Sequence, residues 1–378
     1  MKSNTQSKPR SILFVTGTRA DYGKLEPLAH AAQAAGFAIS FFITGMHMMA
    51  RYGETKTEVK RFAGAEFFEF VNQRAGDAQE FILSKTILGF SDFVQEHRPD
   101  LVVIHGDRVE ALAVSIVCAM KYIASAHIEG GEVSGTIDES IRHCNTKLCT
   151  THFVSSDAAR ARVIALGEAP SNVFNIGSPE LDTHARDSGV TIAQVRERYE
   201  IPFEQFGIAV FHPVTSEVDT IGAQAQSLCD RMAASGRCFI VIAPNNDPGN
   251  EAIFAALDTL PAERFRQIPS MRFAYFSEAM RRSSAIVGNS SAGVREAPFL
   301  GVPSLDIGTR QYRRARCESI TACSAFDVDV IDHFLAQTWA KRFASDTSFG
   351  SGHAAQAFVD VLASPKFWDR PLQKVFSE

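Results

Sequence analysis

Residues 11–35 have the sequence SILFVTGTRADYGKLEPLAHAAQAA, and this stretch decides the fold class. Residues 12–16 are apolar or β-branched and predict a strand buried on both faces, while residues 24–35 have the apolar spacing of a helix. The loop between them carries two glycines and Arg19. The same order of strand, polar loop and helix occurs at LVVIHGDRVEALAVSIVCAMK, residues 101–121. Strands that alternate with helices in this way are typical of βαβ units and parallel sheets.

Further candidate strands follow along the chain, at residues 38–44, 67–71, 124–128, 152–154 and 173–176, and then at 208–211, 239–243, 285–287 and 304–307. Residues 180–189 are the predicted linker between these two series. We therefore predict an α/β protein with two doubly wound, Rossmann-like domains, residues 1–180 and 181–378, and a ligand cleft between them. The last helix is a candidate for packing back on the first domain. A chain of 378 residues is consistent with two domains.

Composition excludes several classes of function. The chain has 38 Lys and Arg against 43 Asp and Glu, a net charge of -5, with no basic stripe, which argues against nucleic-acid binding. Seven scattered cysteines without a C-x-x-C pair indicate neither a disulfide framework nor a zinc site, and they favour a reducing compartment. The longest nearly apolar stretch, residues 111–120, is about half a membrane span. We expect a cytoplasmic protein that binds neither membrane nor metal.

Two of the polar loops that follow strands carry basic side chains. Residues 17–24, GTRADYGK, are neither a G-x-G-x-x-G nor a Walker loop, but glycines let backbone approach a phosphate and Arg19 can form a bidentate contact with it. The alternative is a tight turn with a surface arginine. Residues 105–110, HGDRVE, place an acid and a base at a strand end. Asp107 could act there as a helix N-cap, which is the alternative to a role in chemistry.

The third loop, residues 127–143 with the sequence HIEGGEVSGTIDESIRH, is the richest in polar groups. It holds four carboxylates, three glycines and two histidines after a buried strand. Carboxylates that lie close together acquire separated pKa values, so that one can act as an acid and another as a base. The alternative is a solvated acidic loop in which Ser134 or Thr136 caps a helix over residues 138–146.

The fourth loop, residues 287–296, has the sequence VGNSSAGVRE and offers hydroxyls and free N–H groups to a diphosphate. Ser291 could instead cap the helix, but a capping box is absent because the residue three positions later is Val294. Glu296 is then free to bind vicinal hydroxyls of a ribose. His212, at the end of another strand, faces the same cleft, although a lone histidine is more often structural.

Seven motifs together resemble the hydrolysing UDP-N-acetylglucosamine 2-epimerases, which supply bacterial sialic acid synthesis: GTRADYGKL, TGMHMM, HGDRVEAL, HIEGGEVSGTIDESIRH, FHPVT, GNSSAGVREAP and GVPSLDIGTRQ. The resemblance extends from residue 12 to residue 311 and implies the two-domain GT-B fold. It also implies that Asp107, Glu129 and Asp138 are the catalytic carboxylates. The residues implied to bind UDP are Arg19, Gly23, Arg108, His212, Ser290, Ser291, Glu296 and Arg310.

The resemblance implies a UDP-2-acetamido sugar as substrate, with elimination of UDP to a glycal, addition of water, no cofactor, and a homodimer or a dimer of dimers. A UDP-N,N'-diacetylbacillosamine epimerase of the legionaminic acid pathway, a non-hydrolysing epimerase, a GT-B glycosyltransferase and a catalytically inactive nucleotide-sugar sensor remain alternatives. Two segments depart from the relatives. Gln311 is followed by YRRARC where a glycine-containing stretch is usual, so this loop is expected to differ in shape, and residues 73–89 are shortened beside the sugar.

Overall fold

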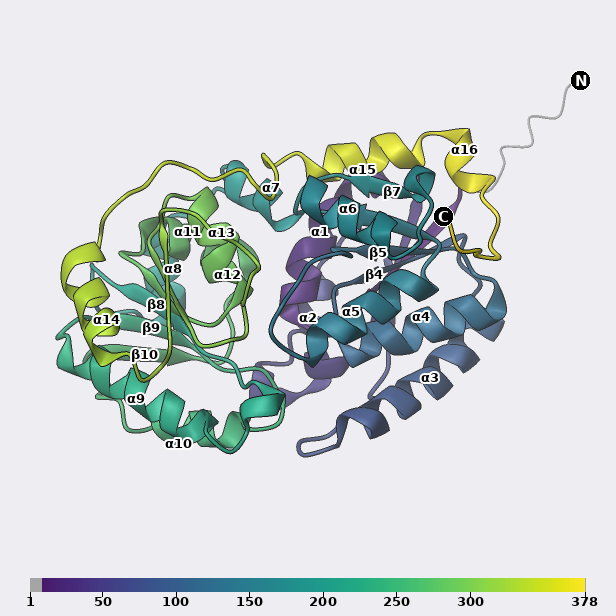
Figure 1. Cartoon of the computed structure of the whole chain (residues 1–378). Coiled ribbons are helices and arrows are strands. Elements are labelled where there is room, and N and C mark those ends of the chain that lie inside the picture. Colours follow the sequence, from purple (N-terminus) through teal and green to yellow (C-terminus); the bar gives the residue numbers. More distant parts are fainter. Residues whose placement is uncertain (1–8, 378) are drawn as a thin grey trace, which may run out of the picture.

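The structure, a computed structural model, describes residues 9–377 of the chain. It consists of two parallel β-sheets, of seven and six strands, with helices on both faces of each sheet (Figure 1). The first sheet has the order β3-β2-β1-β4-β5-β6-β7 and the second the order β10-β9-β8-β11-β12-β13. The prediction of two doubly wound, Rossmann-like domains is therefore confirmed.

The strands of the first sheet agree with the predicted segments to within two residues at each end. They are β1 (Ser11–Thr16), β2 (Ala38–Ile43), β3 (Glu66–Glu69), β4 (Leu101–His105), β5 (Ser125–Ile128), β6 (Thr151–Val154) and β7 (Val173–Asn175). All five residues of β4 are buried, as expected for a strand covered on both faces.

The second sheet contains two strands that the apolar pattern does not reveal. Its strands are β8 (Gly207–Val210), β9 (Phe239–Ile242), β10 (Phe265–Ile268), β11 (Ile286–Gly288), β12 (Ser304–Ile307) and β13 (Ile320–Cys323). The two missed strands, β10 and β13, are the edges of the sheet. β10 carries the polar residues Arg266 and Gln267, which edge strands tolerate, whereas the edge strands of the first sheet, β3 and β7, were recognised by their aromatic and β-branched residues.

Most of the longer helices lie between successive strands along the chain. The helices are α1 (Arg19–Ala34), α2 (Lys56–Val59), α3 (Gln79–Glu96), α4 (Val109–Lys121), α5 (Ile137–Leu148), α6 (Asp157–Ala165), α7 (Glu180–Ala185), α8 (Ile192–Tyr199), α9 (Ile221–Ala234), α10 (Asn250–Leu257), α11 (Phe273–Arg282), α12 (Ser291–Val294), α13 (Glu296–Phe299), α14 (Val328–His333), α15 (Ala354–Leu362) and α16 (Pro365–Trp368).

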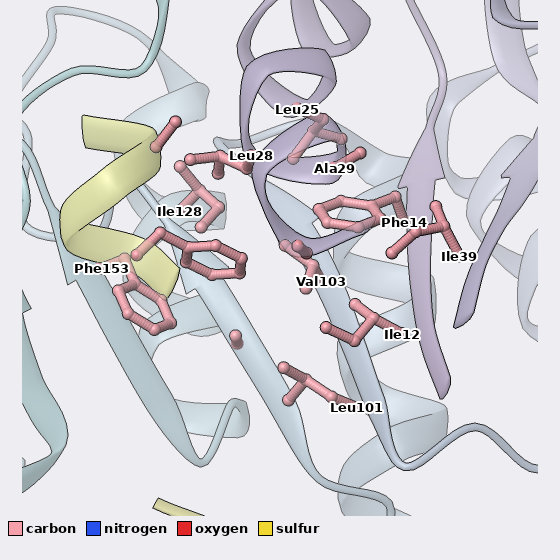
Figure 2. Close-up of a cluster of buried hydrophobic side chains, with 14 of the residues drawn as sticks. Ile12, Phe14, Leu25, Leu28, Ala29, Ile39, Leu101, Val103, Ile128 and Phe153 are labelled. Atoms are coloured by element: carbon pink, nitrogen blue, oxygen red, sulfur yellow. The ribbon is translucent and has the colours of Figure 1, made fainter. Parts of the chain in front are cut away.

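The C-terminal segment crosses back from the second sheet, passes α7 and packs on the first (Figure 1). Ala354, Phe358 and Leu362 of α15 belong to the same buried cluster as Phe14 of β1 and Leu25 of α1. Figure 2 shows this core, with α15 in yellow beside Phe153. Apolar burial of this kind is the main force that holds α15 on the first domain.

The predicted linker over residues 180–189 is not an open connector. Its first six residues form α7, and Leu181 and His184 are buried. Asp182 accepts hydrogen bonds of 2.8 Å from the backbone N–H groups of Ala354 and Ala355, so it caps α15. Residues 180–189 lie between β7 of the first sheet and β8 of the second, and their polar side chains bond to buried groups rather than to water.

The strand order places the ligand loops of both domains opposite each other. It reverses between β1 and β4 in the first sheet and between β8 and β11 in the second. Ligands of open parallel sheets bind outside the carboxyl ends of the strands at such a switch point. The loops after these four strands carry Arg19, Asp107, His212 and Ser290. The topology therefore brings four of the predicted motifs to one crevice.

Candidate active site

A cavity of about 270 Å³ lies between the carboxyl ends of the two sheets. Of the eleven predicted site residues, ten line it: Asp107, Glu129, Asp138, Arg19, Arg108, His212, Ser290, Ser291, Glu296 and Arg310. The exception is Gly23, on α1. A Cβ at this position would lie 2.9 Å from the Phe273 ring, so glycine here permits close packing of α1 against α11.

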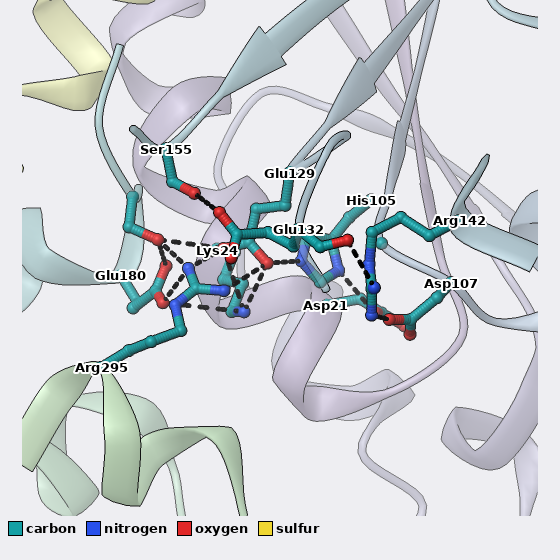
Figure 3. A network of polar contacts seen from close by, with 12 residues as sticks. Asp21, Lys24, His105, Asp107, Glu129, Glu132, Arg142, Ser155, Glu180 and Arg295 are labelled. Atoms are coloured by element: carbon teal, nitrogen blue, oxygen red, sulfur yellow. Dashed lines mark hydrogen bonds and ion pairs between the residues drawn. The ribbon is translucent and has the colours of Figure 1, made fainter. Parts of the chain in front are cut away.

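Glu129 lies at the centre of a buried polar cluster (Figure 3). It directly follows β5 and has a φ of +66°, a left-handed conformation that is uncommon for residues with a side chain. Its carboxylate accepts hydrogen bonds from Lys24 at 3.0 Å and from Arg295 Nη1 at 2.8 Å. Burial opposes ionisation, but Arg295, Lys24 and His105 outweigh it and lower the pKa of Glu129 well below its usual range. Glu129 is therefore held as a carboxylate.

His105 connects Glu129 to a second carboxylate. Its Nδ1 lies 2.8 Å from Asp21 Oδ1, and its Nε2 lies 3.0 Å from Glu129 Oε2. Burial and Lys24 lower the pKa of His105, but the two carboxylates outweigh them and raise it. The sequence placed His105 in a polar loop without giving it a role. This Asp–His–Glu chain can move a proton to or from Glu129.

Asp107 is not an N-cap. The N-cap of α4 is Arg108, which makes no side-chain capping bond, and Asp107 instead forms an ion pair with buried Arg142 of α5. Burial raises the pKa of Asp107, but Arg142 and then Arg314 outweigh it, so that the pKa is lowered. The capping alternative is therefore wrong, and Asp107 is ionised.

Asp138 differs from the other two carboxylates. It lies in the first turn of α5, whose N-cap is Thr136, and Arg310 Nη2 lies 3.4 Å from its Oδ2. Burial and then the charge of Asp107 raise the pKa of Asp138. The cavity therefore holds carboxylates whose pKa values are displaced in opposite directions, the arrangement that lets one act as an acid while another acts as a base.

The second domain supplies the other wall. Ser290, not Ser291, is the N-cap of α12, because its side chain accepts a hydrogen bond from the N–H group of Ala292. Burial, followed by Arg310 and Arg108, keeps the pKa of His212 well below its usual value. His212 Nδ1 accepts from the backbone N–H of Asn245 at 3.1 Å, which leaves Nε2 as the ring donor.

Glu296, Arg19 and Arg108 are also paired with other side chains. Glu296 lies 2.6 Å from His184 Nε2, so it is not free, although it still lines the cavity. Arg19 forms an ion pair of 2.6 Å with Glu58, and Arg108 forms one of 3.0 Å with Asp247. These partners hold the side chains in the orientations that line the cavity.

Sequence reasoning missed several charged residues that complete the cluster: Lys24, Arg142, Glu180, Arg295 and Arg314. All except Glu180 lie in or directly beside motifs recognised in the sequence. Arg295 precedes Glu296 in the fourth loop, and it reaches across the cleft to both Glu129 and Glu180. Its position next to an assigned residue was the available signal.

The loop after Gln311, where the sequence departs from its relatives, carries two arginines beside the cavity. Arg313 has a φ of +62°, the left-handed region that favours glycine. Its neighbour Arg314 lines the cavity, and burial, Arg295 and Arg142 lower the pKa of Arg314 to about 10. The chain thus places an arginine in a conformation usually taken by glycine.

The two domains also touch through their backbones at the cavity. The N–H group of Gly135 donates to the carbonyl oxygen of Arg310 at 3.2 Å. A Cβ on Gly135 would lie 2.0 Å from the carbonyl oxygen of Thr309. Glycine is thus required for this close approach between the third loop and the loop after β12.

A GT-B arrangement with buried carboxylates on one wall, and with arginines, serines and a histidine on the other, is typical of an enzyme that acts on a nucleotide-linked sugar. The family model for UDP-N-acetylglucosamine 2-epimerase matches residues 30–363. The chain belongs to the UDP-N-acetylglucosamine 2-epimerase family, as the sequence motifs predicted.

Known relatives agree with this assignment. The chain is 39% identical over 371 residues to the UDP-N-acetylglucosamine 2-epimerase of Neisseria meningitidis serogroup B, covering 97% of this chain and 98% of the relative. It is 34% identical over 331 residues to the UDP-N,N'-diacetylbacillosamine 2-epimerase (hydrolyzing) of Legionella pneumophila, covering 85% of each. The fold is similar to that of Methanocaldococcus jannaschii UDP-GlcNAc 2-epimerase in complex with UDP-GlcNAc and UDP, with a TM-score of 0.78 at 15% identity, covering 93% of this chain and 99% of that one.

Two kinds of feature are absent from the part of the chain that the structure describes. Across residues 9–377, no helix combines the length and apolar character needed to cross a bilayer. Within the same residues, no group of three or more His, Cys, Asp or Glu side chains is arranged to hold a metal ion.

Proposed function

We propose that this enzyme is a hydrolysing UDP-N-acetylglucosamine 2-epimerase, which converts UDP-GlcNAc and water to N-acetylmannosamine and UDP. The observation that carries the proposal is the set of three cavity carboxylates with oppositely displaced pKa values: Asp107, Glu129 and Asp138. Inversion at C2 with loss of UDP needs proton transfer on two faces of the sugar, and so at least two acid–base groups.

In the first half-reaction, Glu129 removes the C2 proton while the C1–O bond to UDP breaks, which leaves a 2-acetamidoglucal. A carboxylate near C2 also stabilises the positive charge that develops at C1. Glu129 is ionised, as a base must be, although its ion pair with Arg295 weakens its basicity until substrate displaces that contact. His105 can then pass the proton towards Asp21.

In the second half-reaction, Asp138 delivers a proton to C2 on the opposite face, and water adds to C1 while Asp107 accepts a proton from it. The raised pKa of Asp138 and the lowered pKa of Asp107 support this division of roles. Three protons move in all: C2–H to Glu129, Asp138 to C2, and water to Asp107. UDP leaves with the electron pair of the C1–O bond, so nothing is oxidised or reduced.

The UDP portion is proposed to lie in the cleft, held by the second domain together with Arg19 and Arg108 of the first domain. Arg19, Arg310 and the hydroxyls of Ser290 and Ser291 would bind the diphosphate, and Glu296 would accept from the ribose hydroxyls. Charge-assisted contacts of this kind stabilise the departing diphosphate as its charge develops. Arg108 and the Nε2 donor of His212 would complete the binding of UDP.

A second candidate substrate is UDP-N,N'-diacetylbacillosamine, because the Legionella relative named for it is 34% identical to this chain. The Neisseria relative, at 39%, favours UDP-GlcNAc. The TGMHMM segment supports the same choice, and its Met46 lines the cavity.

The reaction can be tested by incubating the enzyme with each UDP sugar in D₂O and recording proton NMR spectra. Free UDP and N-acetylmannosamine carrying deuterium at C2 are expected from UDP-GlcNAc. UDP-N-acetylmannosamine would identify a non-hydrolysing epimerase, and free N-acetylglucosamine a simple hydrolase. Preferential turnover of the diacetamido sugar would replace the proposed substrate. Full retention of the C2–H signal in the product would exclude the proton-exchange route.

We further propose a cytoplasmic homodimer. Seven unpaired cysteines are consistent with a reducing compartment. Exposed Phe81 and Leu88 on α3, with Met120 at the end of the adjacent α4, support an apolar contact between two copies. Light scattering of the purified chain tests the assembly, because a mass of one chain at micromolar concentration would contradict it.

A further inference from the structure

A second cavity, of about 420 Å³, adjoins the candidate active site. The two cavities share four lining residues: Arg19, Thr55, Pro269 and Ser270. Both domains contribute to the second cavity. Residues 53–61 come from the segment between β2 and β3, while residues 198–200 and 266–272 come from the second domain. A ligand here would touch both domains beside the catalytic cleft.

The lining of this cavity is strongly basic. It holds five arginines and two glutamates, a net of three positive charges: Arg19, Arg61, Arg198, Arg266 and Arg272 against Glu58 and Glu200. Glu58 is shared, because it pairs with Arg19 at 2.6 Å and with Arg272 at 2.9 Å. Like charges gathered in a concave, partly buried space repel one another, and an anion relieves that repulsion.

Several donors in the cavity remain available. Arg61 and Arg198 are exposed and form no ion pair with any residue between 9 and 377. Arg198 instead lies over the Tyr199 ring, 5.7 Å from its centroid. Nε and Nη1 of Arg19 are buried without a hydrogen-bond partner among these same residues. The hydroxyls of Thr57 and Ser270 already donate to the backbone carbonyls of Glu54 and Tyr52, so the arginines are the donors that an anion would use.

We propose that this arginine-lined cavity is a second anion site, separate from the sugar-nucleotide site, which takes a small phosphate-bearing ligand. Planar guanidinium groups that converge on one space suit the oxygens of phosphate and diphosphate groups. Because the lining comes from both domains, the bound anion favours the closed cleft. Both ligands contact both domains and so favour the same closed cleft, and through this shared closure occupation of one site raises affinity at the other, a coupling that is reciprocal.

The test is a calorimetric titration of the full chain, already saturated with UDP, with inorganic pyrophosphate at constant ionic strength. UDP fills the active-site cavity, so any saturable uptake of pyrophosphate reports the second site. A preceding titration with UDP alone keeps the two proposals separate, because failure to bind UDP would contradict the proposed function and not the second site. Pyrophosphate would then be titrated into the UDP-free protein, and two classes of binding would be expected.

The matched variants remove two charges each. Arg61→Gln with Arg198→Gln changes only the second cavity, while Arg231→Gln with Arg282→Gln removes two ion-paired arginines that line neither cavity. We expect the first pair to weaken pyrophosphate binding by about tenfold or more and the second pair to leave it within about twofold. UDP should also bind more tightly in the presence of pyrophosphate in the wild type. No saturable uptake by the UDP-saturated wild type, or equal weakening in both pairs, would overturn the proposal.

Discussion

Replacing Arg295 with methionine is expected to destabilise the folded chain by about 3–5 kcal/mol, the range for breaking a buried ion pair. The Arg295 side chain is 0% exposed and contacts two carboxylates that are almost as deeply buried, Glu129 and Glu180. Its loss leaves Lys24 as the remaining full positive charge within 4 Å of both, 3.0 Å from Glu129 and 3.6 Å from Glu180. Two buried carboxylates would then share one cation.

The destabilisation should depend on pH with a definite sign. Arg295 is the largest of the charges that lower the pKa of Glu129, and it also opposes the raised pKa of Glu180. Without it, both pKa values rise in the folded state. A carboxyl group whose folded pKa is raised destabilises the protein above its unfolded pKa, and protonation relieves this as pH falls. The difference from wild type should therefore be larger at pH 8 than at pH 5.5.

The assay is urea unfolding followed by circular dichroism at both pH values, as a double-mutant cycle with Glu129→Gln. The coupling between Arg295→Met and Glu129→Gln should be about 1.5–3 kcal/mol, the range for a charge-assisted hydrogen bond. Arg282→Met is the control, because Arg282 is 60% exposed in its pair with Glu278 and should lose less than about 1 kcal/mol. An Arg295→Met midpoint equal to that of the control, or an additive cycle, would refute this account of the cluster.

Four further predictions concern single positions. Glu129→Gln should lower kcat by roughly 10²–10⁴ with little change in KM, measured as UDP release, and near-normal turnover would remove its role as a base. Arg310→Ala should weaken UDP binding about tenfold to a hundredfold by calorimetry, so an unchanged affinity would contradict its contact with UDP. Despite burial, His152, Lys147 and Lys374 lower the pKa of Glu168 to about 2, so Glu168 stabilises the folded chain above pH 4 and this stability is lost as pH falls from about 4 to 2. Glu168→Gln should therefore make the free energy of unfolding depend less on pH in this range. Arg313→Gly should raise stability by up to about 1 kcal/mol in thermal unfolding, whereas an equal gain from Arg313→Ala would show that strain at φ +62° is not the reason.

Most strands of the fold could be predicted from the composition of short segments of the sequence. Eleven of the thirteen strands of the described residues were found as short runs rich in β-branched and aromatic residues, and strands covered on both faces, such as Leu101–His105, are continuous apolar runs. The strands that were missed, β10 and β13, are the edges of the second sheet, whereas the edges of the first sheet, β3 and β7, were found. The role of residues 180–185 could not be predicted either. The polar residues of this segment predict a linker. Only the fold shows that Asp182 caps α15 and that Glu180 forms an ion pair with Arg295.

Many of the residues that make up the site could be predicted from the sequence, because polar residues cluster directly after the predicted strands. Ten of eleven predicted side chains line one cavity, since the switch points bring the strand ends together. The pairing of charges was not predictable. Asp107 at the start of a helix resembles an N-cap in sequence, and its partner Arg142 is 35 residues away on α5. Nothing in the spacing of Glu129 indicates an arginine 166 residues later in the chain.

The three proposed catalytic carboxylates depend on the two domains in different ways. Asp107 is paired with Arg142 of its own domain, so its main cationic partner is present whether the cleft is open or closed. Glu129 and Asp138 are paired with Arg295 and Arg310, which both come from the other domain. The Coulomb interaction that sets these two charges falls as the domains separate and water enters. The Gly135 N–H bond to the Arg310 carbonyl holds the third loop at the distance where the arginines act. Closure of the cleft therefore adds the main cross-domain cations to Glu129 and Asp138, while Asp107 keeps Arg142 when the cleft opens and loses only the weaker influence of Arg314 and Arg310.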